Sequence, residues 1–296
     1  MTLTACSSSK STSQANKTTS ALKPQVEGTK QAPAQYGFMQ VANDSKERLW
    51  FDSYSIAKDD KLKGLYVIKN GKATYYNLGT FSITEHSGIF SIDYNLTFAD
   101  IEKMSNKEII AKAKKIDKET YLKQFESLQT YTEDFINKGE LYQKNHDDEI
   151  FYEEGKASAE KVLKVIDNFK GEEGYKKYRK QTTNIQLTAM ATTDASGNNV
   201  QSEKIELPKF LPWVVSYVEG YSAYSEGTYD DTDDKVVTTE SVGIGTNTSI
   251  AGPVYGSYYL GFKGLVTRDF TGGLLTADVL GTDNVVEKTS LKSSSN

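Results

Sequence analysis

The hydrophobic pattern of this 296-residue chain changes its period twice, and that change sets the expected fold class. From Tyr36 to Tyr94, aromatic and β-branched residues form short runs separated by polar breaks, which is typical of β-strands. From Thr97 the apolar residues recur at helical spacing, and beyond about residue 183 the helical signal disappears. This order predicts an α+β protein with an antiparallel β-hairpin unit, a middle helical segment and a C-terminal antiparallel β-sheet.

Two short motifs predict local structure within these regions. Asn70-Gly71 lies between two strand-like runs and predicts a tight hairpin turn, because both of its central residues need positive φ. Ser105 and Glu108 have the spacing of a capping box at the start of a helix. The helical pattern that follows is long, so we expect a break near Asp117 or Thr130.

Other segments are assigned by composition and period alone. Met39 to Val41 is expected to be a strand, and residues 158 to 169 are expected to form a second helix. Residues 185 to 190 and 200 to 207 flank a polar turn and predict a further hairpin.

Charge and rare residue types exclude several classes of function. The chain has 40 acidic and 35 basic residues, a net charge of −5, so no basic surplus is present for nucleic acid. One cysteine, Cys6, excludes an internal disulfide framework, and with only two histidines a multi-ligand zinc site is not expected. No run of 18 apolar residues occurs, which argues against a membrane-spanning helix.

The start of the chain carries the most specific motif. Leu3, Thr4, Ala5 and Cys6 are followed by a serine tract and a polar segment. This arrangement resembles the lipobox of bacterial lipoproteins, a family in which the signal peptide is cut before the cysteine. The resemblance implies that Cys6 is the lipidated N-terminus, carrying a diacylglyceryl group and palmitate-type acyl chains. It also implies a membrane partner through the lipid anchor and a location at the extracytoplasmic face of the cell membrane.

The expected organisation of the whole chain follows from the resemblance and the change of period. Residues 1–5 would be the remnant of a signal peptide, and residues 6–35, rich in Ser, Thr, Lys, Gln and Ala, a disordered lipidated tether. Residues 36–182 form an expected α+β region of hairpins and then helices, and residues 183–282 a β-rich region. Residues 283–296 are expected to be a disordered tail.

Aromatic residues are dense in the β-rich region and are candidates for a binding face. Tyrosine and tryptophan combine a large contact area with a polar tip, which suits recognition of proteins or carbohydrates. The alternative is that they pack a sheet core. The candidate binding residues are Trp213, Tyr217, Tyr221, Tyr224 and Tyr258.

A dense acidic run in the same region offers a weak candidate for a cation site. It lacks the glycine and the terminal glutamate of an EF-hand loop, so a solvated acidic loop is the alternative. The residues are Asp230, Asp231, Asp233 and Asp234.

No convincing catalytic set occurs in the sequence. The β-rich region has no histidine or cysteine, and no G-x-S-x-G elbow is present. We therefore expect no cofactor and lean against an enzyme. The sequence favours an anchored surface lipoprotein that binds a cell-wall or protein ligand. Two alternatives stay open, a cell-wall-acting hydrolase that uses carboxylates, and a protective lipoprotein that sequesters a toxin or phage component.

Overall fold

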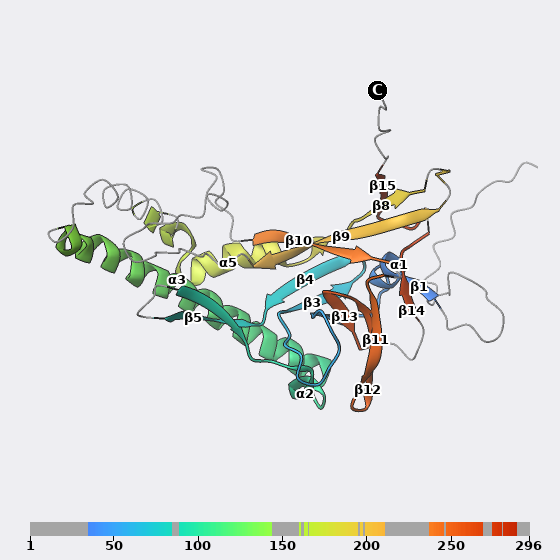
Figure 1. The fold of residues 1–296 in the computed structure, drawn as a ribbon, viewed down its shortest axis with the longest axis horizontal. Helices are drawn as coiled ribbons and strands as arrows, with labels where there is room; N and C mark the ends of the chain where they lie inside the picture. Colours follow the sequence, from blue (N-terminus) through green and yellow to red (C-terminus); the bar gives the residue numbers. More distant parts are fainter. Residues whose placement is uncertain are drawn as a thin grey trace, which may run out of the picture.

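A computed structural model describes most of the chain from residue 35 onwards and confirms the α+β class (Figure 1). Its described residues are 35–84, 89–143, 160, 163–164, 166–194, 196–197, 199–210, 237–245, 247–268, 274–279 and 281–288.

The larger sheet has seven strands, all paired antiparallel. Their order across the sheet is β11-β12-β13-β2-β3-β4-β7, so strands from the N-terminal and C-terminal parts of the chain lie next to one another. The pairing of β2 with β13 joins the two parts. The strand bounds are β2 Arg48–Asp52, β3 Gly64–Lys69, β4 Lys72–Asn77, β7 Ile185–Gln186, β11 Ser249–Val254, β12 Ser257–Phe262 and β13 Leu265–Thr267.

The smaller sheet has four strands in the order β10-β9-β8-β15. Strand β9 pairs antiparallel with both β8 and β10. The pairing of β8 with β9 confirms the hairpin that was predicted between residues 185–190 and 200–207. The bounds are β8 Ala189–Thr193, β9 Val200–Phe210, β10 Val237–Ile244 and β15 Val285–Lys288.

Strand β15 corrects one expectation about the end of the chain. Residues 283–296 were expected to be disordered, but Val285 to Lys288 pair in parallel with β8. Asn284 adopts a positive φ of 65°, and its carbonyl accepts a hydrogen bond from the Ala189 amide at 3.0 Å. The edge of β8 that is not paired with β9 therefore orders this segment.

Two short pairs complete the strands. Strand β1 (Gln35–Gly37) pairs in parallel with β14 (Leu274–Thr276), and β5 (Gly79–Thr84) pairs antiparallel with β6 (Ile89–Tyr94).

The helices are α1 (Phe38–Ala42), α2 (Phe98–Ile101), α3 (Asn106–Gln143) and α5 (Gly171–Thr182). The capping box at the start of α3 is confirmed, since the Ser105 amide donates to Glu108 at 2.8 Å and the Glu108 amide donates back to the Ser105 hydroxyl at 3.3 Å.

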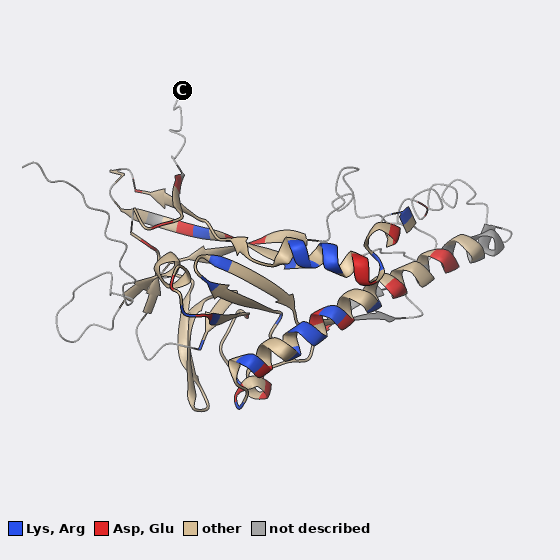
Figure 2. Ribbon diagram, turned by 180° about the vertical axis from the view of Figure 1, so that it is seen from behind, with Lys and Arg blue, Asp and Glu red and all other residues tan. Residues whose placement is uncertain are grey.

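Helix α3 has no break at either expected position. Asp117 points its carboxylate away from the helix backbone and accepts the Asn77 amide hydrogen of β4 at 2.9 Å. Thr130 donates its hydroxyl to the Glu126 carbonyl one turn earlier, at 3.1 Å, which leaves the helix intact. Figure 2 shows basic and acidic residues along the length of α3, and most of those whose burial is described are exposed, as expected for a helix with one solvated face.

Two further segments differ from the sequence-based expectation. Residues 39 to 41 are part of α1 instead of a strand, because the Asp278 carboxylate accepts the amide hydrogens of Met39 and Gln40 at the start of this helix. The second segment is the stretch that follows Lys170. Gly171 turns the chain with a φ of 67° and begins α5, a separate helix that the sequence pattern does not predict.

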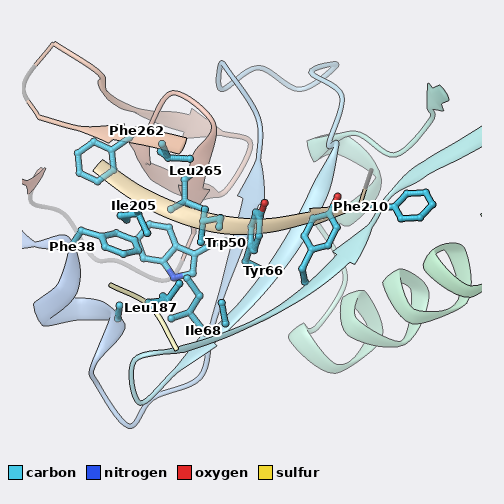
Figure 3. Close-up of a cluster of buried hydrophobic side chains, with 14 of the residues drawn as sticks. Phe38, Trp50, Tyr66, Ile68, Leu187, Ile205, Phe210, Phe262 and Leu265 are labelled. Atoms are coloured by element: carbon cyan, nitrogen blue, oxygen red, sulfur yellow. The ribbon is translucent and has the colours of Figure 1, made fainter. Parts of the chain in front are cut away.

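The larger sheet is buried on both faces. One face packs against the smaller sheet through aromatic and aliphatic side chains of both, including Trp50, Tyr66, Ile205 and Phe262 (Figure 3). The other face packs against α2 and the start of α3. Along a strand such as β2, successive side chains therefore point alternately into one hydrophobic core and into the other.

The Asn70-Gly71 turn is confirmed, with φ of 51° and 70° at its two residues, and it yields a stability prediction. A Cβ on Gly71 would lie 2.5 Å from the Asn43 side-chain oxygen, whereas one on Gly197, also at positive φ, would meet nothing within 4 Å. We expect Gly71→Ala to lower the free energy of unfolding by about 2 kcal/mol and Gly197→Ala by about 1 kcal/mol. Urea denaturation measures both, and equal losses would contradict the close contact.

Candidate functional site

The strand alternation of both sheets brings charged side chains into the layer between them. On β9, Lys209 is in phase with Ile205 and Leu207, which are buried in that layer, so Lys209 lies on the same face. On β2, Asp52 is in phase with Trp50 and faces the same layer from the larger sheet.

Lys209 bridges two carboxylates from different sheets. Its Nζ lies 2.7 Å from Glu240 Oε2 on the neighbouring strand β10 and 3.4 Å from Asp52 Oδ2 on β2. Asp52 is fully buried, whereas the side chains of Lys209 and Glu240 are 24% and 20% exposed. We call Asp52, Tyr66, Lys209 and Glu240 the inter-sheet polar cluster.

Burial dominates the electrostatics of this cluster. Removal from water raises the pKa of Asp52 to about 6, and the Glu240 carboxylate adds to the rise while the Lys209 ammonium opposes it. Burial alone would lower the pKa of Lys209, but the carboxylates of Asp52 and Glu240 outweigh it and raise that pKa. The cluster therefore holds a permanent cation beside a carboxyl group that titrates close to neutral pH.

Some buried polar atoms of the cluster have no hydrogen-bond partner. Both carboxylate oxygens of Asp52 and the hydroxyl of Tyr66 lack one, although Lys209 is within ion-pair distance of Asp52. Burial, with the nearby carboxylates of Asp52 and Glu240, raises the pKa of Tyr66 well above its ordinary range, so the hydroxyl stays protonated. Buried polar atoms are normally satisfied by protein, water or a ligand.

A tyrosine and a lysine connect the cluster to the protein surface. Tyr54 is 53% exposed, and the Lys63 ammonium lies 4.2 Å from the centre of its ring. Burial and the charges of Glu240 and Asp52 raise the pKa of the Tyr54 hydroxyl, which places it within their electrostatic reach. Tyr54 thus places an exposed aromatic ring next to the inter-sheet polar cluster.

The chemistry of this arrangement suits recognition of donor groups and proton exchange better than metal binding. The Lys209 ammonium occupies the place between the two carboxylates that a cation would take. Across the described ranges no group of three histidine, cysteine, aspartate or glutamate side chains could hold a metal ion.

A second buried carboxylate has a structural role. Asp117 accepts hydrogen bonds from the Tyr178 hydroxyl at 2.6 Å, the Tyr175 hydroxyl at 2.9 Å and the Arg179 guanidinium at 3.1 Å, in addition to the Asn77 amide. Burial raises its pKa, and the Arg179 charge and the donors oppose that rise. This network ties α3, α5 and β4 together.

Most residues proposed from the sequence lie outside the described part of the chain. Tyr258 is described on β12 and is 41% exposed, so it points to solvent and does not join the inter-sheet polar cluster. The other sequence candidates, which lie outside the described residues, are Cys6, Trp213, Tyr217, Tyr221, Tyr224, Asp230, Asp231, Asp233 and Asp234.

The inter-sheet polar cluster was not found from the sequence. One signal was present, because Lys209 continues the inward period of Ile205 and Leu207 and a charged residue at an inward position is unusual. Asp52 gives no such signal. It follows three consecutive apolar residues, and because β2 is buried on both faces these residues do not alternate with polar ones.

Two observations bear on how the chain compares with other proteins and with membranes. None of the helices in the described ranges has the length and apolar character needed to cross a bilayer. Searches against protein families, curated proteins and solved structures find no match to this chain.

Proposed function

We propose that this protein is a membrane-anchored extracytoplasmic lipoprotein whose folded part binds a ligand or partner at the cell surface. The proposal of a lipid anchor rests on the sequence Leu3-Thr4-Ala5-Cys6 and on the serine-rich, polar segment that follows it. A diacylglyceryl group has two chains, enough for stable residence at a membrane, where one chain is marginal.

Fractionation of the bacterial host tests the anchoring. We expect the wild-type chain in the membrane fraction and a Cys6→Ser variant in the soluble or secreted fraction, because the serine cannot carry the thioether-linked lipid. A Ser8→Ala variant is the matched control and should stay with the membrane. Equal partition of wild type and Cys6→Ser would contradict the proposal.

The binding part of the proposal rests on the inter-sheet polar cluster. Its buried Asp52 oxygens and Tyr66 hydroxyl lack hydrogen-bond partners, and the partly exposed Lys209 and Glu240 lead from them to the surface. A ligand rich in hydroxyl or amide groups, such as a cell-wall fragment, supplies the donors that Asp52 needs and acceptors for Lys209.

Co-sedimentation with purified cell walls tests this site on the full chain carrying Cys6→Ser. We expect Asp52→Asn and Lys209→Met each to weaken binding at least tenfold, since each removes a charged hydrogen-bond group, worth about 1.5–3 kcal/mol. Glu206→Gln is the control, because Glu206 lies on β9 but faces outward and accepts the Ser241 hydroxyl. Unchanged binding by both cluster variants, with native circular dichroism, would exclude the cluster as the ligand site.

One observation favours a cell-wall hydrolase as a second candidate function. Asp52, with a pKa raised to about 6, and Glu240, bridged to it by Lys209, form a carboxylate pair in unequal environments. Release of soluble sugar from cell walls, lost in Asp52→Asn, would support an enzyme. Binding to cell walls without release of soluble sugar would favour a binding protein over an enzyme. A protective lipoprotein would use the same binding function with a toxin or phage component as ligand.

A further inference from the structure

A second carboxylate pair lies at the other end of the layer between the sheets. Glu203 begins the inward series of β9 residues that ends at Lys209, and its Oε2 accepts the Asp278 amide hydrogen at 2.7 Å. Both residues are almost fully buried, with exposed fractions of 3% for Glu203 and 2% for Asp278. They are 75 residues apart in the sequence.

Asp278 in turn holds α1 in place. Its Oδ2 accepts the Met39 amide hydrogen at 2.7 Å and its Oδ1 the Gln40 amide hydrogen at 3.1 Å. The residue before the helix, Gly37, has no side chain to cap it, so Asp278 supplies the cap from a distant part of the chain. Phe38 of α1 then packs edge-on against Trp50, with ring centres 5.1 Å apart.

The surroundings of Glu203 do not favour a second negative charge. Its cross-strand neighbours are Ala191 on β8 and Ile244 on β10, and α1 and β14 carry no charged residue. The charged group that faces Glu203 within the described residues is Asp278, which is itself an acid. Two adjacent buried carboxylates are stable only while they share a proton.

The hydrogen bonds place that proton on Glu203. Burial raises the pKa of Asp278 too, but the two backbone amide hydrogens that it accepts oppose this rise, whereas Glu203 Oε1 has no hydrogen-bond partner. Burial and the Asp278 charge raise the pKa of Glu203 to about 8.

We propose that Glu203 and Asp278 form a proton-dependent latch that holds α1 against the core while Glu203 is protonated and releases α1 when Glu203 ionises. On ionisation, repulsion between the carboxylates displaces Asp278 from the amides of Met39 and Gln40. Helix α1 then loses its cap and Phe38 leaves Trp50. The latch is independent of the proposed lipid anchor and of ligand binding.

Tryptophan fluorescence tests the latch in the full chain. The protein has two tryptophans, so a Trp213→Phe background leaves Trp50, which touches α1, as the single reporter. We expect a sigmoidal red shift of Trp50 emission between pH 6 and 9.5 with a midpoint near 8, while far-UV circular dichroism stays native. Glu203→Gln should abolish the shift because glutamine cannot ionise. Glu206→Gln, on the outer face of the same strand, should leave it intact.

Hydrogen exchange provides a second readout that needs no variant. Amides of residues 38–42 in the wild-type chain should lose at least tenfold in protection between pH 7 and 9, after correction for intrinsic exchange, while those of β3 keep theirs. An unshifted Trp50 spectrum, a shift that persists in Glu203→Gln, or loss of protection in α1 and β3 together would overturn the latch.

Discussion

Replacing Asp117 with alanine is expected to lower the free energy of unfolding by about 3–5 kcal/mol. The carboxylate is buried, and its removal leaves the Arg179 guanidinium and the hydroxyls of Tyr175 and Tyr178 without their acceptor in the interior. The loss comes less from the missing attraction than from the polar groups left behind, because each unsatisfied buried donor costs about 1–3 kcal/mol.

Urea denaturation followed by circular dichroism measures this loss. Glu119→Ala is the matched control, since Glu119 lies on the same helix and its pair with Lys115 is exposed, with oxygen and nitrogen 3.8 Å apart. Its effect should stay below about 1 kcal/mol. A loss at Asp117 no larger than that at Glu119 would show that the network does not hold α3 to α5 and β4.

The stability of the protein is expected to fall by about 4–5 kcal/mol between pH 5 and pH 8, mainly through Glu203. The ordinary pKa of glutamate is 4.5, and that of Glu203 in the folded protein is raised to about 8. Across this window the folded state binds more protons than the unfolded state, so a rise in pH favours unfolding. Asp52, raised from 3.8 to about 6, acts in the same direction at the lower end of the window.

Other carboxylates do not cancel this trend. The pKa values of Asp100 and Glu108 are lowered by hydrogen bonds from their capping partners, so their stabilising contributions are complete above the ordinary pKa and are lost only in acid. Urea midpoints at pH 5, 6.5 and 8 therefore test Glu203 directly. Glu203→Gln should remove most of the fall and leave the smaller part that comes from Asp52. A wild-type stability that rises over this range would contradict the buried, protonated Glu203.

Elements that depend on neighbouring residues were predictable from the sequence, and elements that depend on distant ones were not. The Asn70-Gly71 turn and the capping box at Ser105 are set by residues within a few positions of each other. Helix α1 depends on Asp278, which lies 239 residues from Met39, so its own residues predict a strand.

The candidate site likewise combines features that the sequence predicts with features that depend on distant residues. A strand period predicts which residues share a face, and it places Lys209 inward with Ile205 and Leu207. It does not predict which sheet packs on that face, and the pairing of Lys209 with Asp52 exists only because β9 lies over β2. The aromatic residues that the sequence offers as a binding face, with the exception of Tyr258, lie outside the described residues.

The most direct test of the central proposal is the intact mass of the protein purified from its bacterial host, expressed with its upstream DNA. We expect a chain that begins at Cys6 and carries the added mass of a diacylglyceryl group, and we expect the Cys6→Ser variant to lack that mass. An unmodified chain that still carries Met1 to Ala5 would contradict the anchor and the extracytoplasmic location together.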